Sequence, residues 1–276
     1  MNRITLSVAV FAAAAWLTLS VGVALAADAP TVDEIVQKAN YVAYYQGADG
    51  KADVRMSIMA KGGSKQNRRF SILRRDLADK DTPDPKFTGE QKFYVYFHEP
   101  ADVNKMAFLV HKHMDKDDDR WLYLPALDLV KRIASSDKRT SFVGSHFYYE
   151  DVSGRNVDAD THELAETTKD YYVLKNTPKD AKSVEFAYYK MWIHKTTFLV
   201  VQTSYYDAQD KEYRRYKASG VKQIEGFWTV VKSEMHDLRD GGHTVLEYDS
   251  VDYNVGLPDD IFTERYLRQA PMQHLK

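Results

Sequence analysis

Short segments that alternate apolar and polar residues are the feature that most limits the fold of this sequence. Residues 54–58 and 68–75 alternate on either side of the turn at residues 61–64. Further strands are predicted at residues 92–97, which carry apolar groups on both faces, and at residues 227–237. A period of two residues is typical of strands, and short polar turns between such segments join antiparallel neighbours. The sequence therefore predicts about ten or eleven strands, mostly joined by hairpins.

One amphipathic helix is predicted before the strands, over residues 31–45. Thr31 and Glu34 have the spacing of a capping box, and apolar residues follow at helical intervals. The predicted class is therefore α+β, mostly β: a large curved antiparallel sheet, open like half a barrel, around a few helices. One long helix cannot cover such a sheet, so its concave side is expected to enclose a pocket or a plug.

Residues 135–170 lack the alternation and are predicted to contain no strand. Within them, residues 141–151 are aromatic without being periodic, which indicates a loop with one short helical turn. This segment is the candidate plug or lid.

Residues 1–26 have the composition of a secretory signal peptide. Arg3 is the only charge before Asp28, and residues 24–26 form a small-x-small cleavage site. The apolar stretch is also long enough to span a bilayer, which leaves a retained anchor as the alternative. We expect residues 27–276 to form a single exported domain. The chain has no Cys, which excludes disulfides, thiolate metal sites and a lipidated N-terminal cysteine.

Three short motifs bear a partial likeness to metal sites. Residues 162–166 (His-Glu-Leu-Ala-Glu) lack the second His of a zinc helix. Residues 115–119 have the acidic residues of a calcium loop but are followed by Arg120 where Gly is required. His111 and His113 share one face of a strand. A solvated loop, hairpin tip or strand end explains each one better, so we predict no metal and no cofactor.

Catalytic signatures are equally weak. Phosphate-binding, dinucleotide-binding, nucleophile-elbow and zinc-protease motifs are absent from the sequence. A hydrolase using Glu150 and Asp151 near His146 is the enzymatic alternative. Adjacent side chains on an extended segment point apart, so a capping or turn role is the preferred interpretation, and we predict no catalytic residue and no enzyme.

The charges exclude one class of partner and leave another open. The 38 Lys and Arg residues nearly balance the 40 Asp and Glu residues, which argues against binding nucleic acid. Basic residues do occur in adjacent pairs. Such pairs belong either to a solvated outer face or to a surface that contacts phosphate head groups. The pairs are Arg68-Arg69, Arg74-Arg75, Lys131-Arg132, Lys138-Arg139 and Arg214-Arg215.

Apolar side chains on the strands and in the aromatic segment form the candidate ligand site. A curved antiparallel sheet with few helices has more inward apolar surface than it can fill, and such folds commonly hold one apolar ligand. Methionine suits a site that adapts to flexible chains. The predicted cavity residues are Met56, Ile58, Phe70, Ile72, Phe93, Val95, Phe97, Trp121, Tyr123, Phe142, Phe147, Met191 and Ile193.

Two longer motifs resemble a known family. Residues 121–125 (Trp-Leu-Tyr-Leu-Pro), followed by Lys-Arg-Ile at 131–133, resemble a segment of the bacterial outer membrane lipoprotein-sorting protein family. Residues 141–151 resemble a second segment of that family, with His146 where Asp is usual. The family lies in the superfamily of the periplasmic lipoprotein carriers LolA and LolB, and the resemblance extends over about residues 31–268.

The resemblance implies a fold, a place and a role. It implies a LolA/LolB-like half-barrel in the periplasm, with an apolar cavity that receives acyl chains and no enzymatic activity. The implied partners are a lipid or acylated protein cargo and an inner-membrane exporter of the resistance-nodulation-division class. The expected function is thus a periplasmic carrier in outer-membrane lipid or lipoprotein trafficking. The alternative is an accessory protein that docks on the exporter without carrying cargo.

Overall fold

The structure is a computed structural model that describes residues 29–77 and 89–275. The chain divides between Pro30 and Thr31 into two units, and all the described helices and strands belong to the second. The predicted signal peptide or anchor at residues 1–26 lies outside the described residues. None of the described helices is long and apolar enough to cross a bilayer.

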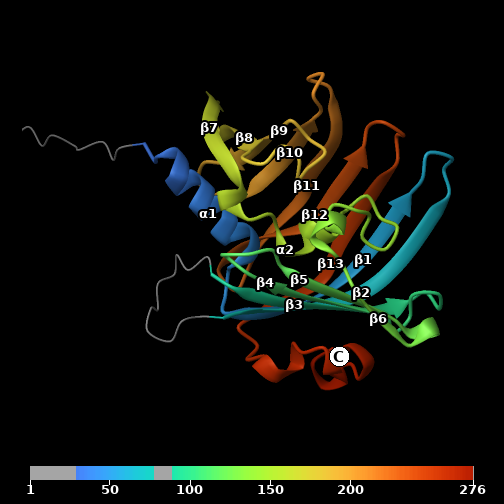
Figure 1. The fold of residues 1–276 in the computed structure, drawn as a ribbon. Helices are drawn as coiled ribbons and strands as arrows, with labels where there is room; N and C mark the ends of the chain where they lie inside the picture. The colour runs from blue at the N-terminus through green and yellow to red at the C-terminus, as the bar shows by residue number, and fades with distance from the viewer. Residues whose placement is uncertain (1–28, 78–88, 276) are drawn as a thin grey trace, which may run out of the picture. The chain divides into compact units, whose positions relative to one another are not determined.

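The described residues form thirteen strands and three α-helices (Figure 1). The strands are β1 (Asp49–Met59), β2 (Lys65–Asp76), β3 (Gln91–Glu99), β4 (Ala107–Lys112), β5 (Asp119–Leu124), β6 (Leu129–Arg132), β7 (Asp160–Thr167), β8 (Tyr171–Pro178), β9 (Tyr188–His194), β10 (Val200–Tyr206), β11 (Glu212–Ile224), β12 (Phe227–Asp237) and β13 (His243–Tyr253). The helices are α1 (Val32–Tyr44), α2 (Tyr149–Ser153) and α3 (Arg265–Arg268).

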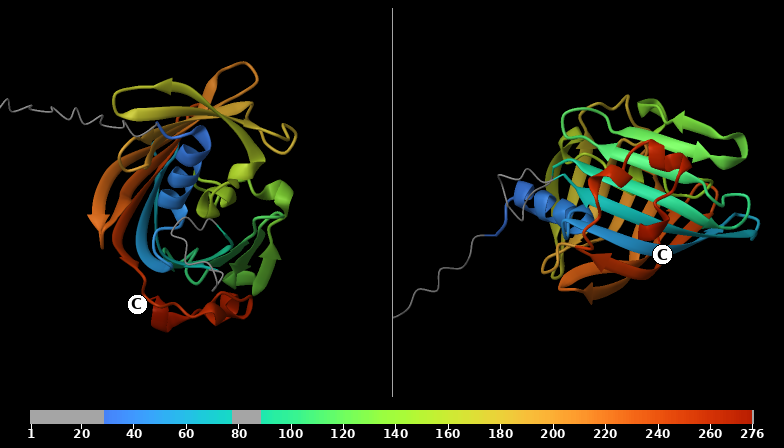
Figure 2. Two further views of the ribbon diagram at one scale, coloured as in Figure 1. Left: turned by 90° about the vertical axis from the view of Figure 1, so that its left-hand side faces the viewer. Right: turned by 90° about the horizontal axis from the view of Figure 1, so that it is seen from below.

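The strands form one antiparallel sheet made of two meanders. The order is β6-β5-β4-β3-β2-β1-β13-β12-β11-β10-β9-β8-β7, so the first and last strands pair in the middle. The connection from β6 to β7, residues 133–159, therefore runs from one edge of the sheet to the other. Figure 2 shows it crossing the concave side beside α1. We call it the crossing segment. The predicted class, a curved open sheet around a few helices, is confirmed, and the strands outnumber the predicted ten or eleven.

Strand β7 corrects the prediction that residues 135–170 contain no strand. It is an edge strand whose residues after Asp160 are almost all exposed, so neither face selects apolar side chains. Exposed edges commonly carry charged residues that discourage pairing with other chains. Glu163 and Glu166 are such charged residues on β7. Because they stand among the exposed positions of both faces, the sequence shows no alternation of apolar and polar residues there.

Helix α1 begins as the sequence predicts. The Thr31 hydroxyl accepts a hydrogen bond from the Glu34 N–H (3.2 Å), and the Glu34 carboxylate accepts one from the Thr31 N–H (2.8 Å). These bonds satisfy two N–H groups that the first turn leaves without helical partners. The buried face of the helix, with Ile35 at its centre, packs on Leu174 and Ile193 of β8 and β9.

The other end of α1 is fixed by an arginine on the sheet. Arg74 of β2 donates hydrogen bonds to the carbonyl oxygens of Tyr44 (2.6 Å), Gln46 (2.6 Å) and Gly47 (2.9 Å). A cation there satisfies carbonyl groups that the last turn leaves free and complements the helix dipole. Because Arg74 is itself fixed within β2, it determines where α1 ends and thus where Tyr44 lies over the concave face.

The convex side of the first meander is covered by the end of the chain. Residues 257–275 pack over β2 to β5, and Ile261 and Phe262 are fully buried against them. The Tyr94 hydroxyl donates a hydrogen bond to the carbonyl oxygen of Tyr266 (2.7 Å). This cover explains why β3 carries buried residues on both faces, as its sequence predicts.

We expect the cover to contribute strongly to stability. Phe262→Ala removes a fully buried ring, and such a truncation costs about 3–5 kcal/mol of the free energy of unfolding. Met272→Ala, in the same segment at a side chain 43% exposed, is expected to change it by less than about 0.5 kcal/mol. Urea unfolding of both variants measures the difference. Equal losses would show that the segment does not pack on the sheet.

Candidate ligand cavity

The register of the sheet determines which side chains face the concave side. Across β10, β11 and β12, Thr203 pairs with Tyr216 and Tyr216 pairs with Met235. Further along, Leu246 of β13 pairs with Met56 of β1. Directly paired residues share one face of a sheet, so these side chains all point inward. They line a cavity of about 430 Å³, within the range of roughly 300–1,000 Å³ usual for small-molecule sites.

The first meander and the crossing segment supply the more apolar wall of this cavity. Eight of the predicted residues line the cavity. Met191 comes from β9 of the second meander, and the other seven come from the apolar wall: Met56, Phe70, Ile72, Phe93, Val95, Phe142 and Phe147. The inward positions of the residues on strands follow from the period of two of a strand, whereas Phe142 and Phe147 belong to the crossing segment, which does not alternate. Whether they contact a ligand is a prediction that rests on the proposed function.

The other five predicted residues lie elsewhere. Ile58 and Phe97 are in the core that continues from the apolar wall, and Ile193 lies under α1. Trp121 and Tyr123 pack against the C-terminal cover on the convex side. Successive side chains of a strand point to opposite faces of the sheet. Leu122 of β5 belongs to the inner core, so its neighbours Trp121 and Tyr123 point to the convex side.

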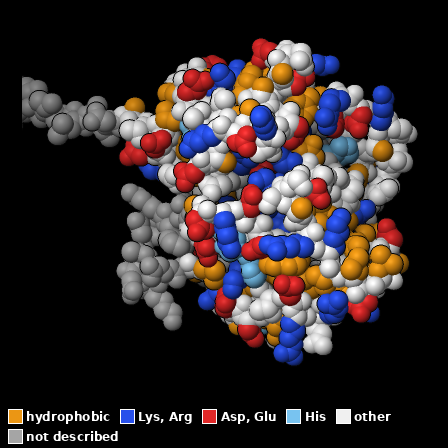
Figure 3. Space-filling view, viewed as in Figure 1, with side chains coloured by type: hydrophobic (Ala, Val, Ile, Leu, Met, Phe, Trp, Pro, Cys, Tyr) orange, Lys and Arg blue, Asp and Glu red, His pale blue; other side chains and the backbone are white. Residues whose placement is uncertain are grey.

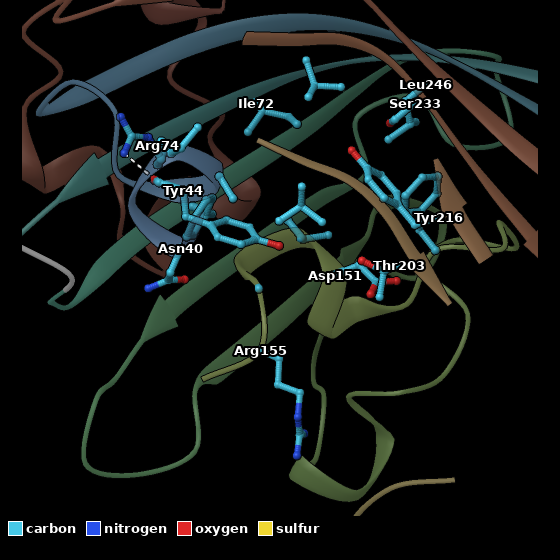
Figure 4. A pocket seen from close by; sticks show the side chains of 18 of the residues that line it. Asn40, Tyr44, Ile72, Arg74, Asp151, Arg155, Thr203, Tyr216, Ser233 and Leu246 are labelled. Carbon is cyan, nitrogen blue, oxygen red and sulfur yellow. Dashed lines mark hydrogen bonds between the residues drawn. The ribbon is translucent and has the colours of Figure 1, made fainter. Parts of the chain in front are cut away.

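Tyrosines make the opposite wall, which also carries Met235 and Leu246, the more polar of the two, and sequence reasoning missed them. Tyr44 of α1, Tyr205 of β10, Tyr216 of β11 and Tyr248 of β13 all line the cavity, and we call them the tyrosine cluster. Figure 4 shows Tyr44 and Tyr216 extending toward the same space from different elements, with Asp151 nearby. The available signal was the 19 tyrosines of the chain, but their number alone indicates only a preference for strands.

The pKa values of these phenols are raised by burial and by neighbouring acidic groups. Burial raises the pKa of Tyr205 and of Tyr248 to about 12 each. Burial also raises the pKa of Tyr44 well above its usual value, and Asp151 and the other three phenols of the cluster raise it further. All four hydroxyls are therefore protonated at neutral pH and can both donate and accept hydrogen bonds.

Buried ion pairs hold the crossing segment in place. The Asp151 carboxylate binds Arg214 of β11, whose side chain is 1% exposed. The Glu150 carboxylate binds Arg139 of the same segment at 2.5 Å, and Arg139 in turn binds Glu185, outside the segment, at 2.6 Å. Asp151 also accepts a hydrogen bond from the Tyr148 N–H (2.6 Å), which caps α2. Removing one partner of such a pair leaves an uncompensated charge, so the pairs restrict α2 to one position.

Comparisons with known proteins agree with this geometry. A family model described only as that of an uncharacterized protein matches residues 89–269. A comparison with curated proteins finds no match. The crystal structure of a DUF1329 family protein from Desulfovibrio piger is 31% identical, with a TM-score of 0.75, over 86% of this chain and 98% of that one. The chain belongs to the DUF1329 family.

Two further crystal structures connect this DUF1329 protein with the family that its sequence resembles. One, described as an outer membrane lipoprotein-sorting protein domain from Vibrio parahaemolyticus, is 26% identical, with a TM-score of 0.74, over 85% of this chain and 97% of that one. A LolA superfamily protein from Nitrosomonas europaea is 22% identical, with a TM-score of 0.64, over 86% of this chain and 100% of that one. The second shows the shared fold, and the resemblance predicted from residues 121–133 and 141–151 is confirmed.

In this DUF1329 protein, the three residues of the hydrolase alternative, Glu150, Asp151 and His146, each bind a different partner. Glu150 and Asp151 bind different arginines, and Asp151 has the capping role that the sequence favours. The Nδ1 atom of His146 lies 2.8 Å from the Thr244 hydroxyl, and burial lowers the pKa of this imidazole. These contacts explain the three side chains as anchors of the crossing segment.

The histidines of the partial metal motifs contact other protein groups through their ring nitrogens. Both nitrogens of His162 have partners, Asn176 Oδ1 at 2.6 Å and the Val157 carbonyl oxygen at 2.9 Å. His111 contacts the Phe262 carbonyl oxygen (2.7 Å), whereas His113 lies between Glu90 and Asp119. In residues 29–77 and 89–275, no three His, Asp or Glu side chains are grouped so that they could hold a metal ion.

Two of the basic pairs, Arg74-Arg75 and Arg214-Arg215, divide between the two faces of the sheet. Arg74 and Arg214 point inward and form internal contacts, which neither sequence interpretation included. Their outward neighbours lie beside carboxylates, Arg75 near Asp49 (3.7 Å) and Arg215 beside Glu212. Figure 3 shows blue and red side chains interspersed over the face seen there, as expected of a solvated surface.

The contact between Gly154 and Tyr44 can be tested by a double-mutant cycle. Gly154 ends α2 with φ 76° and ψ 152°, a conformation nearly restricted to glycine, and a Cβ there would lie 2.5 Å from the Tyr44 ring. We expect Gly154→Ala to lower the free energy of unfolding. About 1–3 kcal/mol of the loss should disappear when Tyr44 is Ala, because only the steric part depends on the ring. An unchanged loss in the Tyr44→Ala background would show that the ring does not rest on Gly154.

Lys112 should make stability depend on alkaline pH. Its ammonium is buried beside the Ser153 carbonyl oxygen (2.8 Å), and burial lowers its pKa from 10.5 to about 8. Between these values the unfolded chain binds a proton that the folded protein lacks, so the contribution of Lys112 to the free energy of unfolding rises with pH.

The measurement is the difference in that free energy between the wild type and Lys112→Met. We expect the difference to grow in favour of the wild type by up to about 3 kcal/mol from pH 8 to 10.5. Lys217→Met, at an exposed side chain, controls for the loss of one charge. Parallel pH profiles of the wild type and Lys112→Met would contradict the lowered pKa.

Proposed function

We propose that this protein is a periplasmic carrier that binds a lipid, a lipoprotein acyl chain or a similar apolar ligand in its cavity. It would serve the trafficking of lipids or lipoproteins to the outer membrane. The observation that carries the proposal is the cavity of about 430 Å³ on the concave side of the sheet, with an apolar wall. The likeness to a lipoprotein-sorting domain over 97% of that domain supports it.

The energetics of transfer give such a carrier a purpose. Removing each CH₂ group from water is worth about 0.8 kcal/mol, so an acyl chain of about sixteen carbons gains roughly 10 kcal/mol or more. A lipid therefore crosses an aqueous compartment slowly unless a protein shields it. A curved sheet with an apolar inner face supplies that shield without a catalytic group. The proposed function is therefore binding and transport, not catalysis.

Export is part of the proposal. Residues 1–26 would be cleaved as a signal peptide and residues 27–276 would remain as one domain in the periplasm. Its support is the apolar composition of residues 4–27 and the small residues at 24–26. The mass of protein isolated from a periplasmic fraction should correspond to a chain that begins at Ala27. Recovery of the uncleaved chain in the membrane fraction would favour the anchor instead.

The binding role is tested by mass spectrometry of an organic extract. Protein purified from its native envelope should release a stoichiometric lipid or acylated species, and protein made in the cytoplasm without residues 1–26 should not. Leu246→Trp, at a residue that lines the cavity, should reduce the extracted amount at least about fivefold because the indole occupies ligand space.

Val245→Trp is the matched control for this measurement. Val245 pairs with Ser57 and Glu234 and belongs to the opposite face of β13. It should leave the extracted amount unchanged. Extracts without lipid from both preparations, or equal losses in both variants, would count against ligand binding in this cavity.

A further inference from the structure

The polar wall of the cavity carries hydroxyl groups that the protein itself does not use. Within residues 29–77 and 89–275, the hydroxyls of Tyr44, Tyr205 and Tyr248 form no hydrogen bond with another protein group. These oxygens are also not fully enclosed by protein atoms, unlike the buried nitrogen and oxygen atoms that have no partner in the described part of the chain, such as two nitrogens of Arg214. They therefore face the cavity and not packed protein. Tyr216, the fourth member of the cluster, lies beside the Ser233 hydroxyl.

A free carboxylate oxygen lies beside these hydroxyls. Asp151 Oδ2 accepts the hydrogen bonds from Arg214 and from the Tyr148 N–H, whereas Oδ1 accepts none from the described residues. Asp151 lines the cavity near Thr203, as Figure 4 shows. The polar wall thus offers three phenol groups, which donate or accept, and one acceptor that can receive a hydroxyl hydrogen.

The arginines that line the cavity are already neutralised. Arg139 binds Glu150 and Glu185, Arg155 binds Asp160 at 2.8 Å, and Arg74 is held by Asp76 and the carbonyl groups at the end of α1. A phosphate or carboxylate placed at the polar wall would meet Asp151 without an uncommitted arginine to balance it. The wall therefore fits neutral oxygen groups better than anions.

A plain hydrocarbon chain fits this wall poorly. It would displace the water that can satisfy the three hydroxyls and would offer them no partner in return. Buried polar groups left without partners weaken binding substantially, and sites built to bind a hydroxyl group discriminate against analogues that lack it. The hydroxyls on the strands of the lining all come from β9 to β13, so such a ligand group has a defined side of the cavity to face.

We propose that the ligand is a neutral amphiphile with a hydroxyl or carbonyl oxygen within its apolar body, which binds to the tyrosine cluster and Asp151. This inference rests on the proposed function and adds a chemical class to it.

The test uses two neutral ligands that differ by one hydroxyl group. Methyl oleate and methyl ricinoleate have the same chain except for the mid-chain hydroxyl of the second. Displacement of a neutral fluorescent acyl probe, the methyl ester of cis-parinaric acid, from the protein purified without residues 1–26 gives an affinity for each. We expect methyl ricinoleate to bind about tenfold more tightly, equivalent to about 1.4 kcal/mol.

Substitution of three tyrosines locates the source of the preference. The triple variant Tyr44→Phe, Tyr205→Phe, Tyr248→Phe should lose the preference and bind methyl oleate more tightly than the wild type does. A gain in affinity for the plain chain cannot result from a damaged fold. Tyr188→Phe, whose hydroxyl lies near Asp210 at a hairpin and does not line the cavity, should keep the wild-type preference.

The outcomes separate the two proposals. Failure of the methyl ester of cis-parinaric acid to bind would overturn the proposed function together with this inference. Binding of the probe with equal affinities for the two esters would overturn this inference alone. So would a preference that persists in the triple variant, because the hydroxyls would then not be its source.

Discussion

The pairing of β1 with β13 is the contact on which the rest of the molecule depends. It joins ten residue pairs, from Gly50 with Tyr253 to Met59 with His243, and it unites the two meanders in one sheet. Because the first and last strands meet in the middle, both edges of the sheet lie far from them in sequence. The chain must then return from β6 to β7 across the concave side. The cavity is the space that α1 and the crossing segment leave unfilled.

Much of this fold follows from local chemistry that the sequence displays. The capping box at Thr31, the alternation at residues 54–58 and the apolar groups on both faces at residues 92–97 predicted α1, β1 and β3, because each element selects its own pattern of apolar residues. Strand β7 could not be found in this way, since it is exposed on both faces. Trp121 and Tyr123 were assigned to the cavity because alternation gives parity but does not say which face of a strand is concave.

The polar half of the cavity was hidden for a different reason. Tyrosine is favoured in strands whether it faces water, core or cavity, so its frequency carries no information about position. Only the register places Tyr216 beside Thr203, and only the bonds from Arg74 to the end of α1 bring Tyr44 to the same space. A site assembled from one helix and separate strands exists in the tertiary structure alone.

The buried charges determine the shape of the cavity more than they add to its stability. A buried ion pair such as Arg214 with Asp151 gains little over an apolar pair of equal volume, because both groups lose their hydration. It does penalise any other position of α2, since either group alone would be uncompensated. Two Arg214 nitrogens lack hydrogen-bond partners among the described residues, and the Tyr148 ring, 3.9 Å from the guanidinium carbon, gives them a cation–π contact instead. Fixing α2 in this way keeps Asp151 near Thr203 and the tyrosine cluster (Figure 4). The hydroxyl groups on the strands of the lining all come from β9 to β13, whereas β1 to β3 contribute mostly apolar side chains, so the cavity presents two chemically different sides to whatever enters it.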